Sequence, residues 1–122
     1  MKFELNESQL GIVDGMIDWV RVVDKNNVVL YANKKMKEDL GDITGSKCYE
    51  IFGSGKNCDY CISGETIRKG TIEKKEESIC GRTYMVVSSP VQAGDGKTAC
   101  AVEVFRDITN EKKLAKNINE QN

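Results

Sequence analysis

The chain has 122 residues, which is enough for one domain with a hydrophobic core. Its formal net charge is -1, from 18 basic and 19 acidic residues, and this balance argues against general attraction to nucleic acid or to an anionic membrane. No apolar run approaches the roughly 20 residues that span a bilayer, and the N-terminus has early acidic residues and no continuous apolar stretch. We therefore expect a cytoplasmic protein without a signal peptide, a membrane segment or a nucleic-acid partner.

The first third of the chain predicts a short helix followed by a β-hairpin. Residues 5–14 are expected to be helical, with Asn6 or Ser8 as the N-cap. Residues 16–23 and 28–31 are apolar and rich in β-branched side chains, so they predict two strands. A polar Asp-Lys-Asn-Asn turn separates the two runs, which makes them a hairpin.

The middle of the chain predicts helices. Residues 33–40 are expected to form one helix, which Gly41 ends. Residues 43–70 are rich in glycine and contain short helical pieces around 48–52 and 61–68. We expect this segment to cross one face of the sheet.

The last third predicts three strands and a helix. The strands are expected at residues 71–80, 82–89 and 98–107, with glycine-containing turns between them. Pro90 is placed at the end of the middle strand, where its missing N–H does least harm. A polar helix is expected from Thr109, with Thr109 as its N-cap.

Five strands with helices segregated to one side define an α+β architecture. A single sheet under a helical cover has a concave inner face, which is a natural ligand pocket. Trp19 lies in the first predicted strand, and its side chain is expected either to line such a pocket or to belong to the core.

Chemistry in this chain is expected to depend on sulfur, because the sequence has five cysteines and no histidine. Cys58 and Cys61 form a Cys-x-x-Cys pair whose sulfurs one metal or one cluster can share, and Cys48 lies just upstream. Cys80 is the better candidate for a fourth ligand, because it ends a predicted strand beside a glycine turn. Cys100 alternates with valines and is expected in the core.

Two other interpretations of the cysteines remain open. Cys58 and Cys61 could act as a thiol switch, with a thiolate of lowered pKa near a helix N-terminus. Alternatively, Cys48 and Cys61 are buried structural residues and Cys58 is incidental. A cysteine nucleophile would lack a histidine base, and the chain has no glycine-rich phosphate loop, so we expect no enzymatic activity.

Two long segments of the chain are VVDKNNVVLYANKKMKEDLG and GRTYMVVSSPVQAGDGKTACAVEVFRDIT. The first resembles the opening hairpin and the following helix of the PAS domains of bacterial signalling proteins, and the second resembles the last two strands of that family. The Asp-Ile-Thr ending that leads to an effector resembles RDITNEKKL, so the resemblance covers nearly all of residues 10–114. A cysteine-containing subgroup of the family resembles GSKCYEIFGSGKNCDYC, although Ile62 stands where a proline is usual.

The resemblance implies a PAS-like five-stranded antiparallel sheet, with short helices over one face and a C-terminal signalling helix. Residues 1–108 would form the sensory domain and residues 109–122 a linker helix. Such a module would sense redox state, oxygen or a small ligand through the cysteine-bearing segment. It would pass the signal to an effector such as a histidine kinase, a cyclase or a transcription regulator, without catalytic activity of its own.

By analogy with redox-sensing PAS domains, the implied cofactor is an iron–sulfur cluster held by Cys48, Cys58, Cys61 and Cys80, with zinc or no metal as alternatives. Histidine-ligated haem is excluded because the chain has no histidine. The motif of photoactive flavin domains matches only Asn57 and Cys58. The runner-up is a metal-free PAS domain that binds a small apolar or carboxylated molecule, or a dimerisation module with structural cysteines.

Asp107 precedes the last helix and has two expected roles. It could form an ion pair with Arg82 or Arg106, or it could help to cap the helix.

The last helix is too polar and too short to be stable alone. Its stripe of Leu114 and Ile118 needs a partner surface, which we expect to be the same helix of a second subunit, in a homodimer, or the N-terminal segment around Leu10 and Val13.

Overall fold

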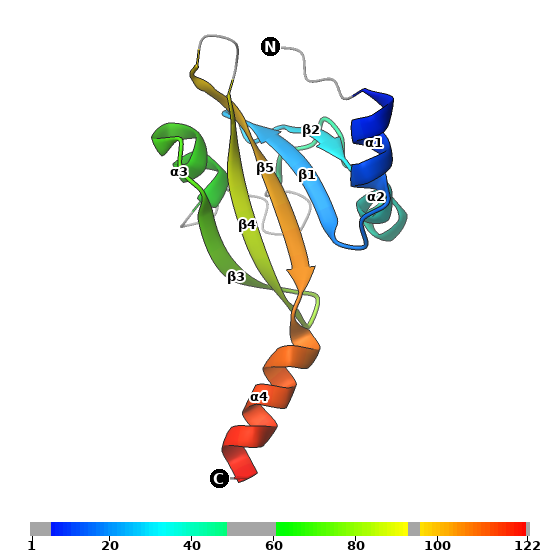
Figure 1. The fold of residues 1–122 in the computed structure, drawn as a ribbon, viewed down its shortest axis with the longest axis vertical. Helices are drawn as coiled ribbons and strands as arrows, with labels where there is room; N and C mark the ends of the chain where they lie inside the picture. Colours follow the sequence, from blue (N-terminus) through cyan, green and yellow to red (C-terminus); the bar gives the residue numbers. More distant parts are fainter. Residues whose placement is uncertain (1–5, 49–60, 93–95, 122) are drawn as a thin grey trace.

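The computed structural model describes residues 6–48, 61–92 and 96–121. It contains one five-stranded antiparallel sheet with the strand order β2-β1-β5-β4-β3 (Figure 1). The strands are β1 Trp19–Asp24, β2 Val29–Ala32, β3 Glu73–Ile79, β4 Arg82–Gln92 and β5 Thr98–Asp107. The helices are α1 Glu7–Asp14, α2 Lys34–Leu40, α3 Ile62–Lys69 and α4 Thr109–Gln121. The predicted sheet is therefore confirmed.

The β1–β2 hairpin forms because its turn satisfies its own backbone. The carboxylate of Asp24 accepts hydrogen bonds from the backbone N–H of Asn26 at 2.8 Å and of Val28 at 3.0 Å. Asn27 adopts a φ of 65°, a left-handed conformation that asparagine tolerates better than most residues. The turn is thus where the sequence predicts it.

Asn33 connects the hairpin to α2. It is the N-cap of α2, and its side-chain oxygen accepts the N–H groups of Met36 and Val20, each at 3.1 Å. Its amide group donates to the carbonyls of Val13 and Asp18 at 3.1 and 2.9 Å. One fully buried side chain therefore fixes the positions of α1, β1 and α2 relative to one another.

The core lies between one face of the sheet and the helices. Met36 of α2 packs with Val23 and Val29, and Ile62 of α3 packs with Val86 and Phe105. The register aligns Val23 with Ala101 and Trp19 with Phe105. The two residues of each strand lie four positions apart, and because side chains alternate between the faces of a strand, this even spacing puts both clusters on the same face of the sheet. In the described residues the helices of segment 33–70 cover that face, as predicted.

The structure corrects several strand boundaries. The first strand begins at Trp19 and not at residue 16, and the third spans Glu73–Ile79 and not residues 71–80. Pro90 lies within β4, which runs on to Gln92. The pairing of β3 with β4 stops at Ser88. Among the described strands β4 therefore pairs beyond that point with β5 alone, and the missing N–H of Pro90 disturbs no second described ladder.

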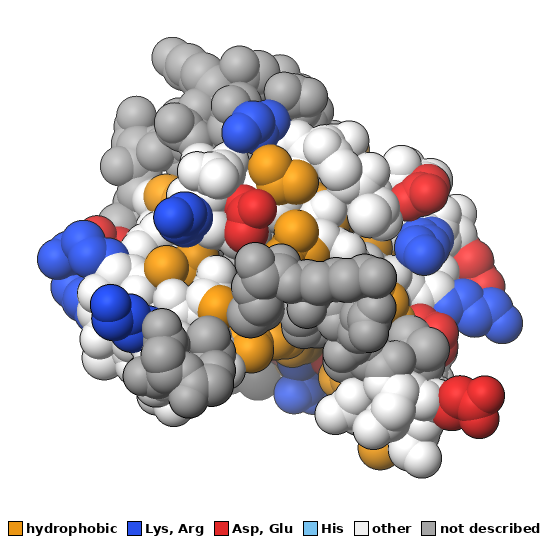
Figure 2. Space-filling view, turned by 90° about the horizontal axis from the view of Figure 1, so that it is seen from above, with side chains coloured by type: hydrophobic (Ala, Val, Ile, Leu, Met, Phe, Trp, Pro, Cys, Tyr) orange, Lys and Arg blue, Asp and Glu red, His pale blue; other side chains and the backbone are white. Residues whose placement is uncertain are grey.

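The helix α4 extends away from the sheet beyond the end of β5 (Figure 1). Figure 2 shows the other end of the molecule, where charged side chains of both signs are scattered around hydrophobic ones, as expected from the balanced composition. Among the described elements, α4 is thus the one that projects from the sheet and its helical cover.

Within the described residues no helix is long and apolar enough to span a membrane.

Candidate functional site

The carboxylate of Asp107 joins the end of the sheet to the first turn of α4. One oxygen accepts a hydrogen bond from the Nε of Arg82, at the start of β4. The other accepts the backbone N–H of Thr109 at 3.0 Å and its hydroxyl at 2.6 Å. The hydrogen bond from Arg82, followed by those from Thr109, lowers the pKa of Asp107 to about 2. Asp107 thus has both roles that the sequence left open, and Thr109 is the first helical residue and not the N-cap.

Further contacts hold the root of α4, by which we mean its first turn and the preceding residue Ile108. The Thr109 hydroxyl accepts the N–H of Thr83 at 2.9 Å, and the N–H of Ile108 donates to the carbonyl of Thr83 at 2.9 Å. One turn later, Lys112 forms an ion pair with Glu76 of β3 at 2.8 Å. The orientation of α4 therefore depends on contacts with two strands.

A half-open cleft of about 470 Å³ lies beside this root. Its apolar lining consists of Ile17 and of three aromatic side chains from three different strands, Trp19, Tyr84 and Phe105. The rings of Trp19 and Tyr84 stack with centroids 4.9 Å apart, and the indole N–H of Trp19 donates to Asp39 at 2.8 Å. Trp19 also packs against both core clusters, so it belongs to the core and lines the cleft at once.

Several charged groups of the cleft are already paired. Asp39 accepts from Trp19 and from Lys35 of α2, which lies at 3.3 Å, and these contacts, that from Trp19 above all, lower the pKa of Asp39. On the other wall, Arg82 pairs with Asp107. Burial raises the pKa of Tyr84, so its hydroxyl stays protonated at neutral pH.

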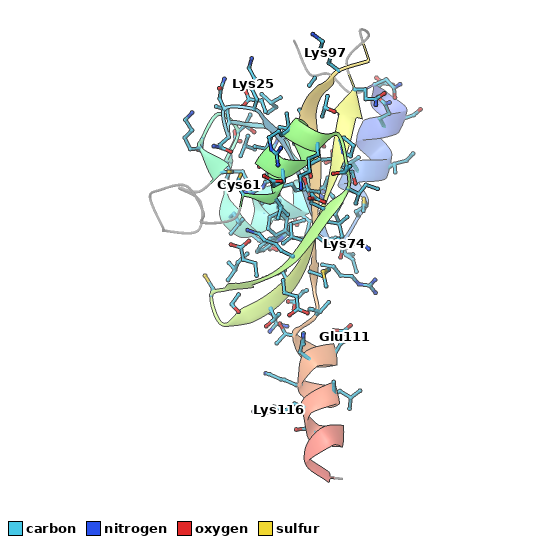
Figure 3. The ribbon with its side chains drawn as sticks, turned by 90° about the vertical axis from the view of Figure 1, so that its left-hand side faces the viewer. Lys25, Cys61, Lys74, Lys97, Glu111 and Lys116 are labelled. Carbon is cyan, nitrogen blue, oxygen red and sulfur yellow. The ribbon has the colours of Figure 1, made fainter. Side chains whose placement is uncertain are left out.

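Cys48 and Cys61 both contact the turn residue Asn27. The N–H of Cys48 donates to the carbonyl of Asn27 at 2.7 Å, and the thiol of Cys61 donates to its side-chain oxygen at 3.6 Å. Cys61 is the N-cap of α3, where its sulfur accepts the N–H of Gly64 at 3.4 Å (Figure 3). The fold therefore brings two of the four predicted metal ligands to one turn.

Of the other cysteines, Cys80 lies in a different turn, Cys100 pairs with Asp24 across β1 and β5, and Cys58 lies outside the described residues. Cys80 is exposed in the β3–β4 turn, with a φ of 50°, and Cys58 is not among the described residues. Cys100 is buried in β5, as expected, and burial raises the pKa of its thiol. In the described parts of the chain, no three cysteine or carboxylate side chains are placed to hold a metal ion. A site at Cys48, Cys58, Cys61 and Cys80 stays a prediction.

Sequence reasoning missed a buried ion pair on the inner face of the sheet. Arg21 and Glu103 face each other across β1 and β5 at 3.0 Å, with side chains 8% and 3% exposed. The guanidinium group of Arg21 also lies 4.9 Å from the centre of the Phe105 ring. Each of the two charged residues interrupts a run of valines, and this was the available signal in the sequence.

Sequence comparison agrees with this architecture. The chain belongs to the PAS fold family, whose sequence model matches residues 13–113. No curated protein matches the chain.

Solved PAS-like structures resemble the chain in fold. A domain of an HTR-like protein from Haloarcula marismortui ATCC 43049 has a TM-score of 0.64 and 23% identity, over 77% of this chain and 100% of that one. The PAS domain of nitrogen regulation protein NR(II) from Vibrio parahaemolyticus has a TM-score of 0.65 and 14% identity, over 84% and 100%. The dimer of VqmA, a LuxR-type receptor from Vibrio cholerae, has a TM-score of 0.62 and 16% identity, over 88% and 53%.

Proposed function

We propose that this PAS domain is a sensory module that passes a signal to a separate effector through α4. The observation that carries the proposal is the position of Asp107, whose single carboxylate binds Arg82 of the sheet and Thr109 of the helix. A change in the sheet or its helical cover that moves β4 relative to β5 would alter these contacts. The orientation of α4 would change with them, because two packings of one element can differ by only a few kcal/mol.

The character of α4 supports this role. It is a polar helix of 13 residues, and isolated helices of that length are marginal in water. Its attachment at Thr109 and Lys112 therefore decides where it points. Leu114 is 62% exposed on α4, which leaves an apolar side chain for a partner surface.

We propose that the partner is the same helix of a second subunit, with a kinase, cyclase or transcription-regulator domain downstream. The likeness to the VqmA dimer and to the PAS domain of NR(II) supports this choice. The side chains of Ile118, in the predicted stripe, and of Leu10, in the N-terminal segment predicted as the alternative partner, lie outside the described set. We further propose that the domain itself is not an enzyme, in keeping with its lack of histidine.

A redox or metal input through the cysteines is a second candidate. It is favoured by the contacts of Cys48 and Cys61 with Asn27, which bring segments 46–48 and α3 together at one turn. Anaerobic purification followed by an absorption spectrum and by iron, sulfide and zinc analysis tests it. Metal that is lost in Cys58→Ala and retained in Cys100→Ala supports a cysteine site. A colourless, metal-free and folded protein contradicts the metal input and favours a small-ligand input.

The signalling role is tested by fusing the chain through α4 to a histidine-kinase core and measuring autophosphorylation. Arg82→Gln removes the contact of Arg82 with Asp107, and Thr109→Val removes the hydroxyl contacts of Thr109 with Asp107 and Thr83. Lys74→Gln removes an exposed charge from β3 as the control. We expect both root variants to change the kinase rate relative to the control. Rates equal to that of the unaltered fusion in both root variants would contradict transmission through α4.

A further inference from the structure

We propose that the cleft at the root of α4 binds a small organic monocation with an apolar body, such as a primary amine that carries an aromatic ring. This inference deepens the proposed sensory function, on which it rests for its biological meaning, by naming a ligand class for a defined place. The cleft volume of about 470 Å³ lies within the range of small-molecule sites.

The apolar part of the cleft suits an aromatic or aliphatic ligand body. Trp19 and Tyr84 form a stacked pair at 4.9 Å, and Ile17 at the edge of the cleft is 86% exposed. A cation above an aromatic face is attracted by the ring quadrupole, and tryptophan is the strongest such partner. The rings therefore favour a ligand that combines apolar surface with positive charge.

The charged side chains of the cleft that take part in neither of its two ion pairs also favour a cation. Lys35 pairs with Asp39, and Arg82 pairs with Asp107, so these four groups offset one another.

Of the remaining charged side chains, two are acidic and one is basic. Asp18, Glu111 and Arg106 line the cleft, and none has a side-chain hydrogen bond or ion pair within the described part of the chain. Two acids against one base leave a net negative site, which disfavours an anionic ligand. A divalent metal is disfavoured as well, because the described residues place no three ligands together.

The two acids belong to different elements of the cleft lining. Asp18 immediately precedes β1, whereas Glu111 lies in the first turn of α4, beside the end of the sheet (Figure 3). A cation between them would contact the sheet side and the helix side at once. A ligand bound in the cleft would thus hold α4 close to β1, and α4 would lose this contact when the ligand dissociates.

The chain contains a single tryptophan, Trp19, so its fluorescence reports on the cleft directly. Phenethylammonium is the probe, because it carries no indole, and 3-phenylpropionate is the matched anion with the same ring and a similar chain. We expect phenethylammonium to change the Trp19 emission saturably at millimolar concentrations and the anion to bind more weakly. Isothermal calorimetry measures the same binding independently of the fluorophore.

Charge variants test the assignment of the acids. Asp18→Asn and Glu111→Gln should each weaken phenethylammonium binding by about 2- to 5-fold, the range of partly exposed ion pairs. Arg106→Gln should strengthen it, and Glu7→Gln on the exposed first turn of α1 should leave it unchanged. Circular dichroism confirms the fold of each variant.

The proposal is overturned if neither fluorescence nor calorimetry detects binding, if the anion binds as tightly as the cation, or if the four variants bind alike. This experiment needs no effector, whereas the kinase fusion needs no ligand. A failure of the cleft assignment therefore leaves the proposed signalling role standing, and a failure of the fusion leaves the binding result standing.

Discussion

Arg82 and Asp107 form an ion pair at the end of the sheet, where β4 begins and β5 gives way to α4. Because Asp107 also caps the first turn of α4 through Thr109, the pair connects the β3–β4 hairpin to the helix. The side chains of Arg82 and Asp107 are 49% and 34% exposed. Because exposed ion pairs contribute little to the free energy of unfolding, this pair orients the helix more than it stabilises the fold.

Replacing Arg82 should raise the pKa of Asp107. In the folded protein that pKa is about 2, below the value of about 3.9 in an unfolded chain. A depressed folded-state pKa contributes stability that is present above the unfolded value and is lost as the pH falls from about 4 to about 2. Arg82→Gln removes the largest cause and should move the pKa toward the ordinary value. Carboxyl carbon chemical shifts measured by NMR against pH test this, and an ordinary pKa for Asp107 in the unaltered protein would contradict it.

Asn33→Ala should strongly destabilise the fold. The substitution removes two acceptor and two donor contacts of a fully buried side chain and leaves the N–H groups of Val20 and Met36 without that partner. We expect a loss of about 2–4 kcal/mol in the free energy of unfolding, measured by urea denaturation. Asn110→Ala on the exposed surface of α4 is the control and should change it by less than about 0.5 kcal/mol. Equal losses of unfolding free energy in Asn33→Ala and Asn110→Ala would contradict the structural role of Asn33.

The buried pair of Arg21 and Glu103 should show strong coupling. Arg21→Met or Glu103→Leu alone leaves one buried charge without its partner, which costs about 3–5 kcal/mol. The double substitution removes both charges and should cost clearly less than the sum of the two. A double-mutant cycle of unfolding free energies measures the difference. Additive effects would mean that Arg21 and Glu103 contribute to stability independently, which would contradict the coupling.

The sequence predicted the order of elements because the signals are local. The β-hairpin depends on the turn at Asp24–Asn27, α2 on the Asn33 cap and Gly41, and the strands on β-branched runs. The cleft was not predictable in this way. Its walls come from Trp19, Lys35, Tyr84 and Glu111, which are distant in the chain and meet only through tertiary packing. Trp19 alone was recognised as a pocket candidate.

Dimerisation through α4 predicts an effect of acidic substitutions on its apolar stripe. Leu114→Asp together with Ile118→Asp should weaken self-association, because each places a charge in the proposed interface. Lys113→Asp on the same helix is the control for the added negative charge. Sedimentation measures the association, with circular dichroism as the check on folding. An unaltered chain that stays monomeric at high concentration contradicts the dimer.

The attachment of α4 to the sheet is tested most directly by amide hydrogen exchange at the N–H of Lys112, which donates to the carbonyl of Ile108 at 2.9 Å. We predict that Arg82→Gln accelerates this exchange by about 5-fold or more, since a charge-assisted contact at the helix root is lost. The N–H of Asp24, in the distant β1–β2 hairpin, should exchange as before, and the control Lys74→Gln should change neither amide. Unchanged exchange at Lys112 in Arg82→Gln, or equal acceleration at Lys112 and Asp24, would contradict the coupling of α4 to the sheet through Arg82 and Asp107.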